Sequence, residues 1–416
     1  MSAIGADVLA MRNGQQTRVA SGGVDPSTVR GRWMSVGSSD HHDPRTAGTE
    51  AAAAAITGPD PTLLVVFCSG RLDPAEVLAG IGTVAAGVPL IGCSSDSEIT
   101  SAGPGEGRVV VTALGGSGLA ARTAFGTGSS GGQRAAGAAA AACVEPVADL
   151  PHTALLLLTD GLVGDQEEIV SGAYEVVGAG VPLVGGAASP HPAAKQTFLL
   201  HGDQVLTDAV VGASIASASP LGIGVRHGWR KVGEPMLVTR CAKGRVVELD
   251  EKPALPTYLE RLSAPAIAYT DPVEFDRFAG TRPIGVRRRS GEEVRNVRTT
   301  ELFLSDGWLS CTGDIPEGGL VWIMEGDEST VLEAAGDACR AAVDALDGHQ
   351  PVGLLAFDCG SRRGVLGEDG SRTEVSRMTG QAGGAPLSGF YSWGEIARTQ
   401  GINGFHHNTV VILAVS

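Results

Sequence analysis

The chain has 416 residues and a formal charge of −15 at pH 7, from 46 acidic and 31 basic side chains. This charge argues against sequence-independent binding of nucleic acid or of an anionic membrane, because both require a basic surface. The sequence also lacks the roughly 18 consecutive apolar residues that cross a bilayer, and its seven cysteines are scattered without a CxxC pair, which argues against a disulfide framework and a structural zinc site.

Residues 1–30 are polar and glycine-rich without periodicity, which predicts a disordered leader. They lack the basic segment and the apolar segment of a secretory signal, so we expect a cytoplasmic protein with reduced thiols. After the leader, the sequence predicts a strand over 34–39 and an alanine-rich helix over 44–56. The proline that opens this helix suits its first turn, where an N–H group has no intrahelical partner.

A short segment recurs three times along the chain. It reads AGVPLIG at 86–92, AGVPLVG at 179–185 and GGAPLSG at 383–389, and each copy follows an apolar run. The spacing exceeds the roughly 20–45 residues of solenoid repeats, which favours duplicated units packed into one compact body. A fourth, weaker echo is RPIGV at 282–286. We therefore expect the function to lie where the copies meet.

The residue pattern of each copy predicts a β-α-β unit. In the first copy a strand over 63–67 is followed by Asp73 and Glu76, which supply the N-cap and the capping carboxylate of a helix. Asp165 and Glu168 repeat this arrangement in the second copy. Each helix leads into a short buried strand at the repeated Pro-Leu pair. Such crossovers are right-handed and join parallel strands.

The segments between these units predict antiparallel strand pairs. We expect pairing of 108–114 with the stretch around Ala121, of 196–200 with 208–215, and of 301–311, through a turn at Ser305, Asp306 and Gly307, with 318–324. A further hairpin over 232–250 is followed by a helix over 253–262, and a late helix over 330–346 opens with a capping box of Thr330 and Glu333.

The predicted fold class is therefore α/β to α+β. Mixed β-sheets carry helices on their outer faces and are built from duplicated β-α-β and hairpin units, which gives a pseudo-symmetric layered sandwich. A change in the pattern near residues 220–235 predicts a domain boundary. We expect an N-terminal domain over 31–228 and a C-terminal domain over 229–416.

Five segments, in this order, resemble the tandem FIST domains of bacterial signal-transduction proteins and F-box proteins. They are GCSSDSEI from Gly92, GVRHGW from Gly224, VVELDEKPALPTYLERL from Val246, GFYSWGEI from Gly389 and HNTVVIL from His407. The resemblance covers residues 33–416 and identifies the two expected domains as FIST N-terminal-like and FIST C-terminal-like.

The resemblance implies an intracellular sensory module that binds a small ligand, an amino acid being the usual suggestion, and it brings no catalytic residues with it. No kinase, cyclase or methyl-accepting segment follows Ser416. The signal is therefore expected to pass to a separate, unknown protein partner.

The loop after the first repeat is one candidate ligand site. It contains Cys93, Ser94, Ser95, Asp96 and Glu98, and it follows a strand whose carboxyl end lies where ligands of open α/β sheets commonly bind. One interpretation is a polar cradle in which Glu98 pairs with a ligand cation. The alternative is a structural turn in which the serines hydrogen-bond to backbone groups.

The equivalent loop after the third repeat is the richest aromatic cluster of the chain. It contains Phe390, Tyr391, Ser392, Trp393 and Glu395. Aromatic rings beside a carboxylate suit an ammonium ligand through cation-π contact. Packing of the rings in the core is the alternative.

Further candidates lie elsewhere in the chain. Arg226, beside His227 and Trp229, either binds a ligand carboxylate by bidentate hydrogen bonds or serves in a structural pair. His407 and Asn408 precede the last predicted strand and are expected in a loop at one sheet edge.

Two other polar groups invite a structural interpretation. Thr159 and Asp160 follow a buried strand and either form part of a pocket rim or cap a turn. His41, His42 and Asp43 resemble metal ligands in type, but adjacent ligands rarely form a site without distant partners, and Asp43 suits a helix cap. We expect no metal and no cofactor.

Two alternatives to a sensor remain. One is a protein-interaction scaffold or adaptor. The other is a hydrolase in which Cys93 or Ser94 is the nucleophile and His227 or His407 the base, which separation in sequence does not exclude. The motifs GxSxG, HExxH and the P-loop are absent, so the sequence favours a protein that is not an enzyme.

Overall fold

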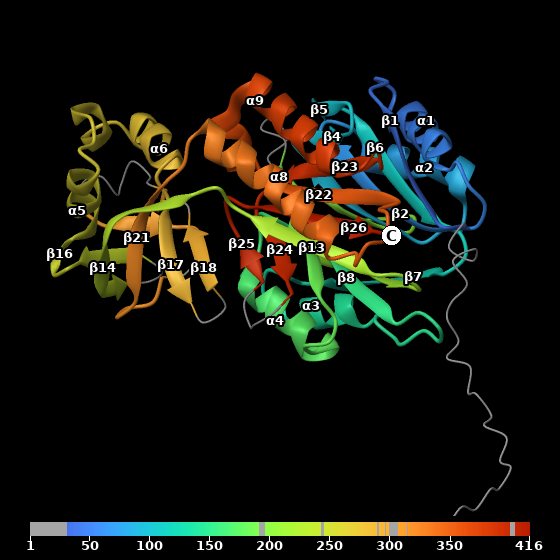
Figure 1. Ribbon diagram of the computed structural model, residues 1–416, viewed down its shortest axis with the longest axis horizontal. Coiled ribbons are helices and arrows are strands. Elements are labelled where there is room, and N and C mark those ends of the chain that lie inside the picture. Colours follow the sequence, from blue (N-terminus) through green and yellow to red (C-terminus); the bar gives the residue numbers. More distant parts are fainter. Residues whose placement is uncertain are drawn as a thin grey trace, which may run out of the picture.

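A computed structural model describes residues 31–190, 196–242, 245–288, 291–295, 297–298, 307–313, 315–399 and 404–416. Within these residues the chain folds into four β-sheets and the helices that cover them (Figure 1). The predicted leader and the turn residues Ser305 and Asp306 lie outside the described residues. The predicted fold class of mixed sheets with helices on their outer faces is confirmed.

Three copies of one element order, β-α-β-α-β-β-β-β, make up the body of the protein. Copy one is β1 (Trp33–Ser39), α1 (Pro44–Ala55), β2 (Pro61–Ser69), α2 (Pro74–Ala85), β3 (Leu90–Ser95), β4 (Glu98–Thr100), β5 (Gly103–Gly105) and β6 (Val109–Gly115). Copy two is β7 (Leu119–Thr127), α3 (Gln133–Ala141), β8 (His152–Thr159), α4 (Gln166–Val177), β9 (Leu183–Ala187), β10 (Leu199–His201), β11 (Gln204–Leu206) and β12 (Ala209–Ser217). Copy three is β13 (Leu221–Arg226), α8 (Glu328–Asp344), β22 (Gly353–Cys359), α9 (Gly360–Gln381), β23 (Leu387–Ser392), β24 (Glu395–Arg398), β25 (Phe405–His406) and β26 (Val410–Val415).

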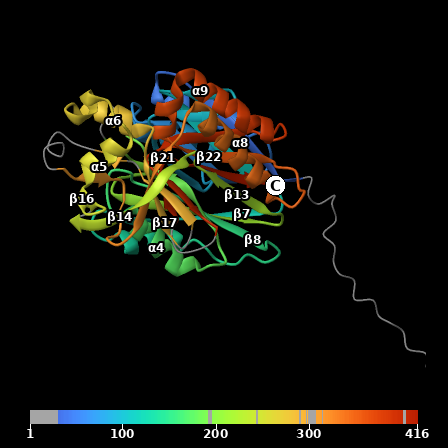
Figure 2. The same ribbon diagram turned by 60° about the vertical axis from the view of Figure 1, so that its left-hand side comes forward.

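The described residues between 229 and 325 interrupt copy three and form a separate lobe, the insert, at one end of the molecule (Figure 1), and this lobe comes forward in Figure 2. Its elements are β14 (Arg230–Ala242), β15 (Arg245–Leu249), β16 (Lys252–Pro253), α5 (Ala254–Arg261), η2 (Ala266–Tyr269), α6 (Pro272–Gly280), β17 (Ile284–Arg288), β18 (Gly291–Arg295), β19 (Val297–Arg298), β20 (Leu309–Cys311) and β21 (Leu320–Glu325). The predicted β14–β15 hairpin and helix α5 are confirmed.

The predicted β-α-β units form because the local sequence starts and stops each helix. Asp43, Asp73 and Asp165 cap α1, α2 and α4 by accepting hydrogen bonds from first-turn N–H groups. Helix α4 stops at Gly178, which has a φ of 69° that favours glycine. The parallel pairs β2–β3, β8–β9 and β22–β23 confirm the predicted crossovers.

Each copy gives its short hairpin to the sheet of another copy. Sheet one has the order β1-β6-β2-β3-β10-β11, so it ends with the hairpin of copy two. Sheet two ends with β24 and β25 of copy three, and sheet three ends with β4 and β5 of copy one. This cyclic exchange ties the copies together. It also brings the loops that follow β3, β9 and β23 to a common place.

The three sheets share one apolar core, while the helices cover their outer faces. The shared core contains leucines, valines and phenylalanines from all three sheets, with Phe67 and Phe357 both packed against Phe390. The pairs α1–α2, α3–α4 and α8–α9 each cover one sheet through a separate apolar cluster. Phe390 is fully buried there, so this aromatic residue belongs to the core.

The glycine that ends each repeat is required by the spacing of the strands. At Gly92, Gly185 and Gly389, a Cβ atom would overlap a backbone carbonyl oxygen of the adjacent parallel strand. Those oxygens belong to Val66, Leu157 and Ala356. These glycines therefore allow two adjacent strands to approach each other closely.

Several sequence predictions about connectivity are wrong. Strands β6 and β7 belong to different sheets, β10 pairs with β3 and β11 instead of β12, and β20 pairs with β15 and β19 instead of β21. The fourth echo overlaps β17, whose neighbours in the described part of the chain, β18 and β21, are both antiparallel, so it does not repeat the parallel unit. Helix α8 is capped by Asp327 with Thr330, not by Thr330 with Glu333.

No described helix is both long and apolar enough to span a membrane.

Candidate functional site

The strand pairing establishes which loop residues of the three copies are equivalent. Leu90, Leu183 and Leu387 occupy the same register position against the preceding strand of their own copy. Counting onward from these leucines makes Asp96, Ser189 and Trp393 equivalent. These residues line one cavity of about 450 Å³. We call it the three-copy pocket; its walls are Asp96, Glu106, Ser189, Gly360, Arg363, Gly364, Gly367, Glu368, Tyr391 and Trp393.

Ser189 joins the loops of the other two copies at this pocket. Its buried hydroxyl donates a hydrogen bond of 2.7 Å to the Tyr391 carbonyl oxygen and accepts one of 3.0 Å from the Asp96 N–H. Copy two diverges from the Ser and Glu pattern of the other copies at this loop. The divergent residue therefore connects the three loops.

The pocket carries an excess of negative charge around an aromatic wall. Arg363 forms ion pairs with Glu106 at 2.8 Å, Glu368 at 2.6 Å and Asp96 at 3.9 Å, so one guanidinium faces three carboxylates. Its Cζ lies 5.5 Å from the centroid of the Tyr391 ring. Trp393 is 44% exposed, although it is large and apolar. The walls therefore suit a cationic group.

The Ser–Glu pairs of the two candidate loops are buried and hold the fold together. Ser95 donates to the Glu98 carboxylate, which also accepts from the Arg108 N–H, and Ser392 donates to that of Glu395. The Glu395 carboxylate further accepts from the N–H and the hydroxyl of Thr409. Each carboxylate thus fixes the backbone at the start of the last strand of its copy.

In copy two, the backbone at the start of the last strand is fixed by Asp160, which is not at the position equivalent to Glu98 and Glu395. Asp160 follows β8 and accepts hydrogen bonds from the Asp208 N–H and the Thr197 hydroxyl. Asp208 precedes β12 as Thr409 precedes β26. The structural interpretation of Asp160 as a cap is confirmed, since it also accepts from the Leu162 N–H.

Burial controls the ionisation of these groups. Loss of hydration raises the pKa of Glu98 and of Glu395 to about 8, although their hydrogen bonds act in the opposite direction. Burial also raises the pKa of the Cys93 thiol well above its ordinary value. The Ser94 hydroxyl donates to the Ser189 carbonyl oxygen and accepts from the Phe198 N–H, so its described partners are backbone groups.

The remaining candidate residues lie in different places. Arg226 is exposed at the end of β13 and donates to the carbonyl oxygen of its neighbour Val225. Asn408 is fully buried; its side-chain oxygen accepts from the Ser361 hydroxyl, and its carbonyl oxygen accepts from the Trp229 indole. His407 lines a second cavity of about 320 Å³ between the body and the insert, and Trp393 lines this cavity too.

The structure therefore separates the eleven candidate ligand residues into groups. Tyr391 and Trp393 line the three-copy pocket, and His407 shares the second cavity with Trp393. Arg226 is apart from both cavities in the described structure. The buried residues beneath the loops are Cys93, Ser94, Ser95, Glu98, Ser392, Glu395 and Asn408.

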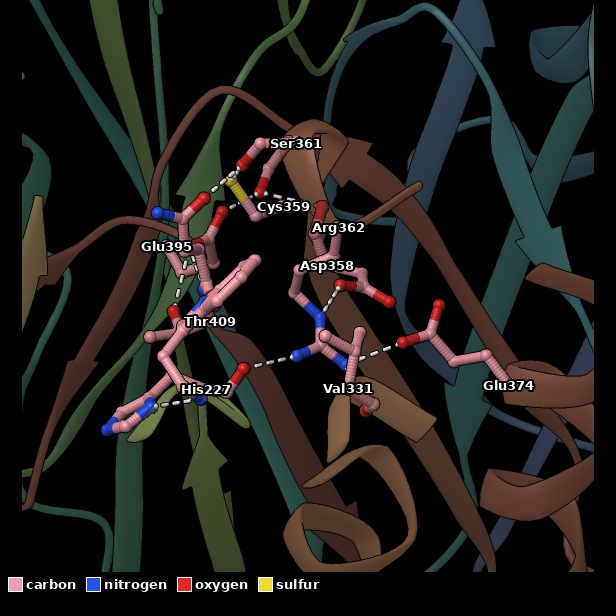
Figure 3. A network of polar contacts seen from close by, with 12 residues as sticks. His227, Val331, Asp358, Cys359, Ser361, Arg362, Glu374, Glu395 and Thr409 are labelled. Atoms are coloured by element: carbon pink, nitrogen blue, oxygen red, sulfur yellow. Dashed lines mark hydrogen bonds and ion pairs between the residues drawn. The ribbon is translucent and has the colours of Figure 1, made fainter. Parts of the chain in front are cut away.

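The sequence analysis missed a buried ion cluster, shown in Figure 3, whose Arg362 directly precedes Arg363 of the three-copy pocket. The Arg362 guanidinium donates to Asp358 at 2.7 Å and to Glu374 at 2.6 Å, and all three side chains are fully buried. Burial raises the pKa of both carboxyls, and the neighbouring Asp358 charge raises that of Glu374 further. The spacing of Asp358 and Arg362 is the only local signal of this cluster.

Arg362 also holds both connections between the body and the insert. Its remaining N–H groups donate to the carbonyl oxygens of His227 at 2.9 Å and Val331 at 3.1 Å (Figure 3). His227 lies where the chain leaves β13 for the insert, and Val331 lies in the first turn of α8, where it returns. One side chain thus joins β22, α9 and the two ends of the insert.

The described residues contain no group of three or more His, Cys, Asp or Glu side chains placed to hold a metal ion. The rings of His41 and His42 stack with centroids 4.6 Å apart, and Asp43 caps helix α1 as predicted.

Comparison with known proteins gives a family match. Models of the FIST N domain and the FIST C domain match residues 62–252 and 254–398. An uncharacterized protein of Mycobacterium tuberculosis (strain ATCC 25618 / H37Rv) is 30% identical over 240 residues, which are 55% of this chain and 59% of that protein. An uncharacterized protein of Mycobacterium bovis is 28% identical over 239 residues, or 55% and 58% of the two chains. The match thus spans about 59% of the length of these relatives.

Among solved structures, the cyanuric acid hydrolase from A. caulinodans is similar over 92% of this chain and 99% of its own, with 10% sequence identity and a TM-score of 0.32.

Proposed function

Since the chain belongs to the FIST family, with a FIST N domain followed by a FIST C domain, we propose that its three-copy pocket binds a small metabolite that carries an ammonium group, such as an amino acid. FIST domains are generally sensory domains of signal transduction and are thought to bind small ligands. The observation that carries the proposal is that Asp96, Ser189 and Trp393, equivalent residues of three copies, line one cavity.

The chemistry of the walls supports an ammonium ligand. Trp393 is 44% exposed and lines the pocket, and a cation over a tryptophan ring gains about 0.5–2 kcal/mol. Among the described residues that line the pocket, Asp96, Glu106 and Glu368 carry carboxylates and Arg363 carries a guanidinium, so a further positive charge improves the local balance. The Ser189 hydroxyl links the loop of Asp96 to the loop of Tyr391 by hydrogen bonds to both backbones.

We propose that the protein acts in the cytoplasm through a separate signalling protein and catalyses no reaction itself. All seven cysteines are free thiols, which is consistent with a reducing compartment. The raised pKa of Cys93 opposes formation of the thiolate that a nucleophile requires.

A thermal-shift screen of the full chain tests the proposed ligand class. Amino acids and small amines are expected to raise the melting temperature, whereas the same compounds without the amino group are not. Trp393→Leu and Asp96→Asn are each expected to weaken binding of the best amine by about tenfold, the scale of one lost charged contact. Asp337→Asn is the control, because Asp337 pairs with Arg340 outside the pocket.

Two results would contradict the proposal. One is that no amine in a broad panel changes the melting temperature. The other is that the best amine binds Trp393→Leu and Asp96→Asn as tightly as it binds the unaltered chain.

A further inference from the structure

The second cavity lies between the body and the insert. Strand β18, at one edge of the insert sheet, faces β25, at the edge of sheet two (Figure 1). Arg295, the last residue of β18, lines the cavity from the insert, and Glu167 of helix α4 lines it from copy two. Its volume of about 320 Å³ is near the lower end of the range for ligand pockets.

Arg295 brings a buried positive charge to this cavity. Its guanidinium donates to the carboxylate of Glu167 across the gap between the lobes. A charge without water around it requires an anionic partner, because its hydration has been lost. Gly313 leaves room for the guanidinium, since a Cβ at this position would lie 2.9 Å from Arg295 Cζ.

We propose that this cavity binds a small monocarboxylate, which takes the place of Glu167 on Arg295. The Glu167 side chain is 29% exposed, whereas that of Arg295 is 1% exposed, so the carboxylate is the partner that can leave. A ligand carboxylate accepts hydrogen bonds from the same planar fork of N–H groups.

The charge of the cavity selects a single carboxylate over a dianion. Of the described residues that line the walls, Asp165 and Glu167 carry carboxylates and Arg295 carries a guanidinium. A phosphate dianion in the place of Glu167 would bring one negative charge more than that side chain does, whereas a monocarboxylate only replaces the charge that Glu167 withdraws. The site is distinct from the three-copy pocket in its ligand, although Trp393 belongs to both walls.

Calorimetric titration of the full chain with pyruvate, and with pyruvamide as its uncharged counterpart, tests the proposal. Pyruvate is expected to bind and pyruvamide is not. Glu167→Gln is expected to bind pyruvate about tenfold more tightly, because the internal competitor and its repulsion are removed. Glu168→Gln is the control and is expected to leave the affinity unchanged, since Glu168 pairs with Arg134 on the surface.

Adding Arg295→Lys to Glu167→Gln is expected to weaken pyruvate binding at least tenfold, because the planar fork is lost while the charge remains. Circular dichroism verifies that the double variant is folded. If it is not folded, the effect of Glu167→Gln alone on pyruvate affinity decides the outcome. The proposal is overturned if pyruvate binds neither protein, if Glu167→Gln leaves its affinity unchanged, or if pyruvamide binds equally well. Asp96→Asn is expected to keep pyruvate binding, so failure of the amine pocket and failure of this site are distinguishable.

Discussion

Replacing Arg362 by methionine is expected to lower the free energy of unfolding by about 3–5 kcal/mol. The substitution leaves the carboxyls of Asp358 and Glu374 fully buried without their cation. It also removes the hydrogen bonds that Arg362 donates to His227 and Val331, at the two ends of the insert. Urea denaturation at neutral pH measures the loss.

Two further proteins show whether the buried charges cause this effect. Arg340→Met removes an exposed ion pair and is expected to cost less than about 1 kcal/mol. The triple variant with Asp358→Leu, Arg362→Met and Glu374→Leu removes all three charges and is expected to recover most of the stability that Arg362→Met loses. If Arg362→Met costs no more than Arg340→Met, the buried cluster does not hold the fold together.

Raising the pH from 5 to 9 is expected to lower the free energy of unfolding by several kcal/mol. Burial raises the pKa of Glu98 and Glu395 from 4.5 to about 8, so the folded chain binds these protons more tightly than the unfolded chain. The stabilisation is complete below pH 4.5 and is lost as the pH rises through about 8. Each carboxyl contributes on the order of 5 kcal/mol, at about 1.4 kcal/mol per unit of pKa difference.

Glutamine variants identify the groups responsible for this pH dependence. Glu395→Gln and Glu98→Gln remove one titrating group each, so each is expected to flatten the curve of unfolding free energy against pH. Glu333→Gln, at a half-exposed residue of helix α8, is the control and is expected to leave the slope unchanged. Urea denaturation at unit steps of pH gives the curves. A slope that is the same in all four proteins would show that the two buried carboxyls titrate normally.

Local sequence rules predicted the helices and strands of each copy better than they predicted which strands pair. The caps at Asp73 and Asp165 and the parallel strands of each β-α-β unit depend on neighbouring residues, and they are confirmed. The hairpin partners were wrong because each short hairpin joins the sheet of another copy. Adjacency in sequence carries no information about such an exchange.

The candidate site was predictable to a similar extent. The repeats indicated that the loops after β3 and β23 are equivalent, and the structure brings Asp96 and Trp393 to one pocket. The serine and glutamate residues that also recur in these loops are buried supports. Duplication preserves packing residues and binding residues alike, so recurrence alone could not separate these two roles.

The arginines that organise both cavities gave no sequence signal. Arg363 lies in a glycine-rich segment, and its partners include Asp96 and Glu106, which are far from it in sequence. Arg295 pairs with Glu167 across the gap between the lobes. Only the fold shows which basic residue meets which acidic residue.

A crystal structure of the full chain with the best amine from the thermal-shift screen tests the central claim most directly. The ligand is predicted to lie in the three-copy pocket, with its ammonium group between the indole of Trp393 and the carboxylate of Asp96, and in contact with all three copies. A structure in which the amine is bound elsewhere and the three-copy pocket is empty would contradict the claim that ligand sensing occurs where the copies meet.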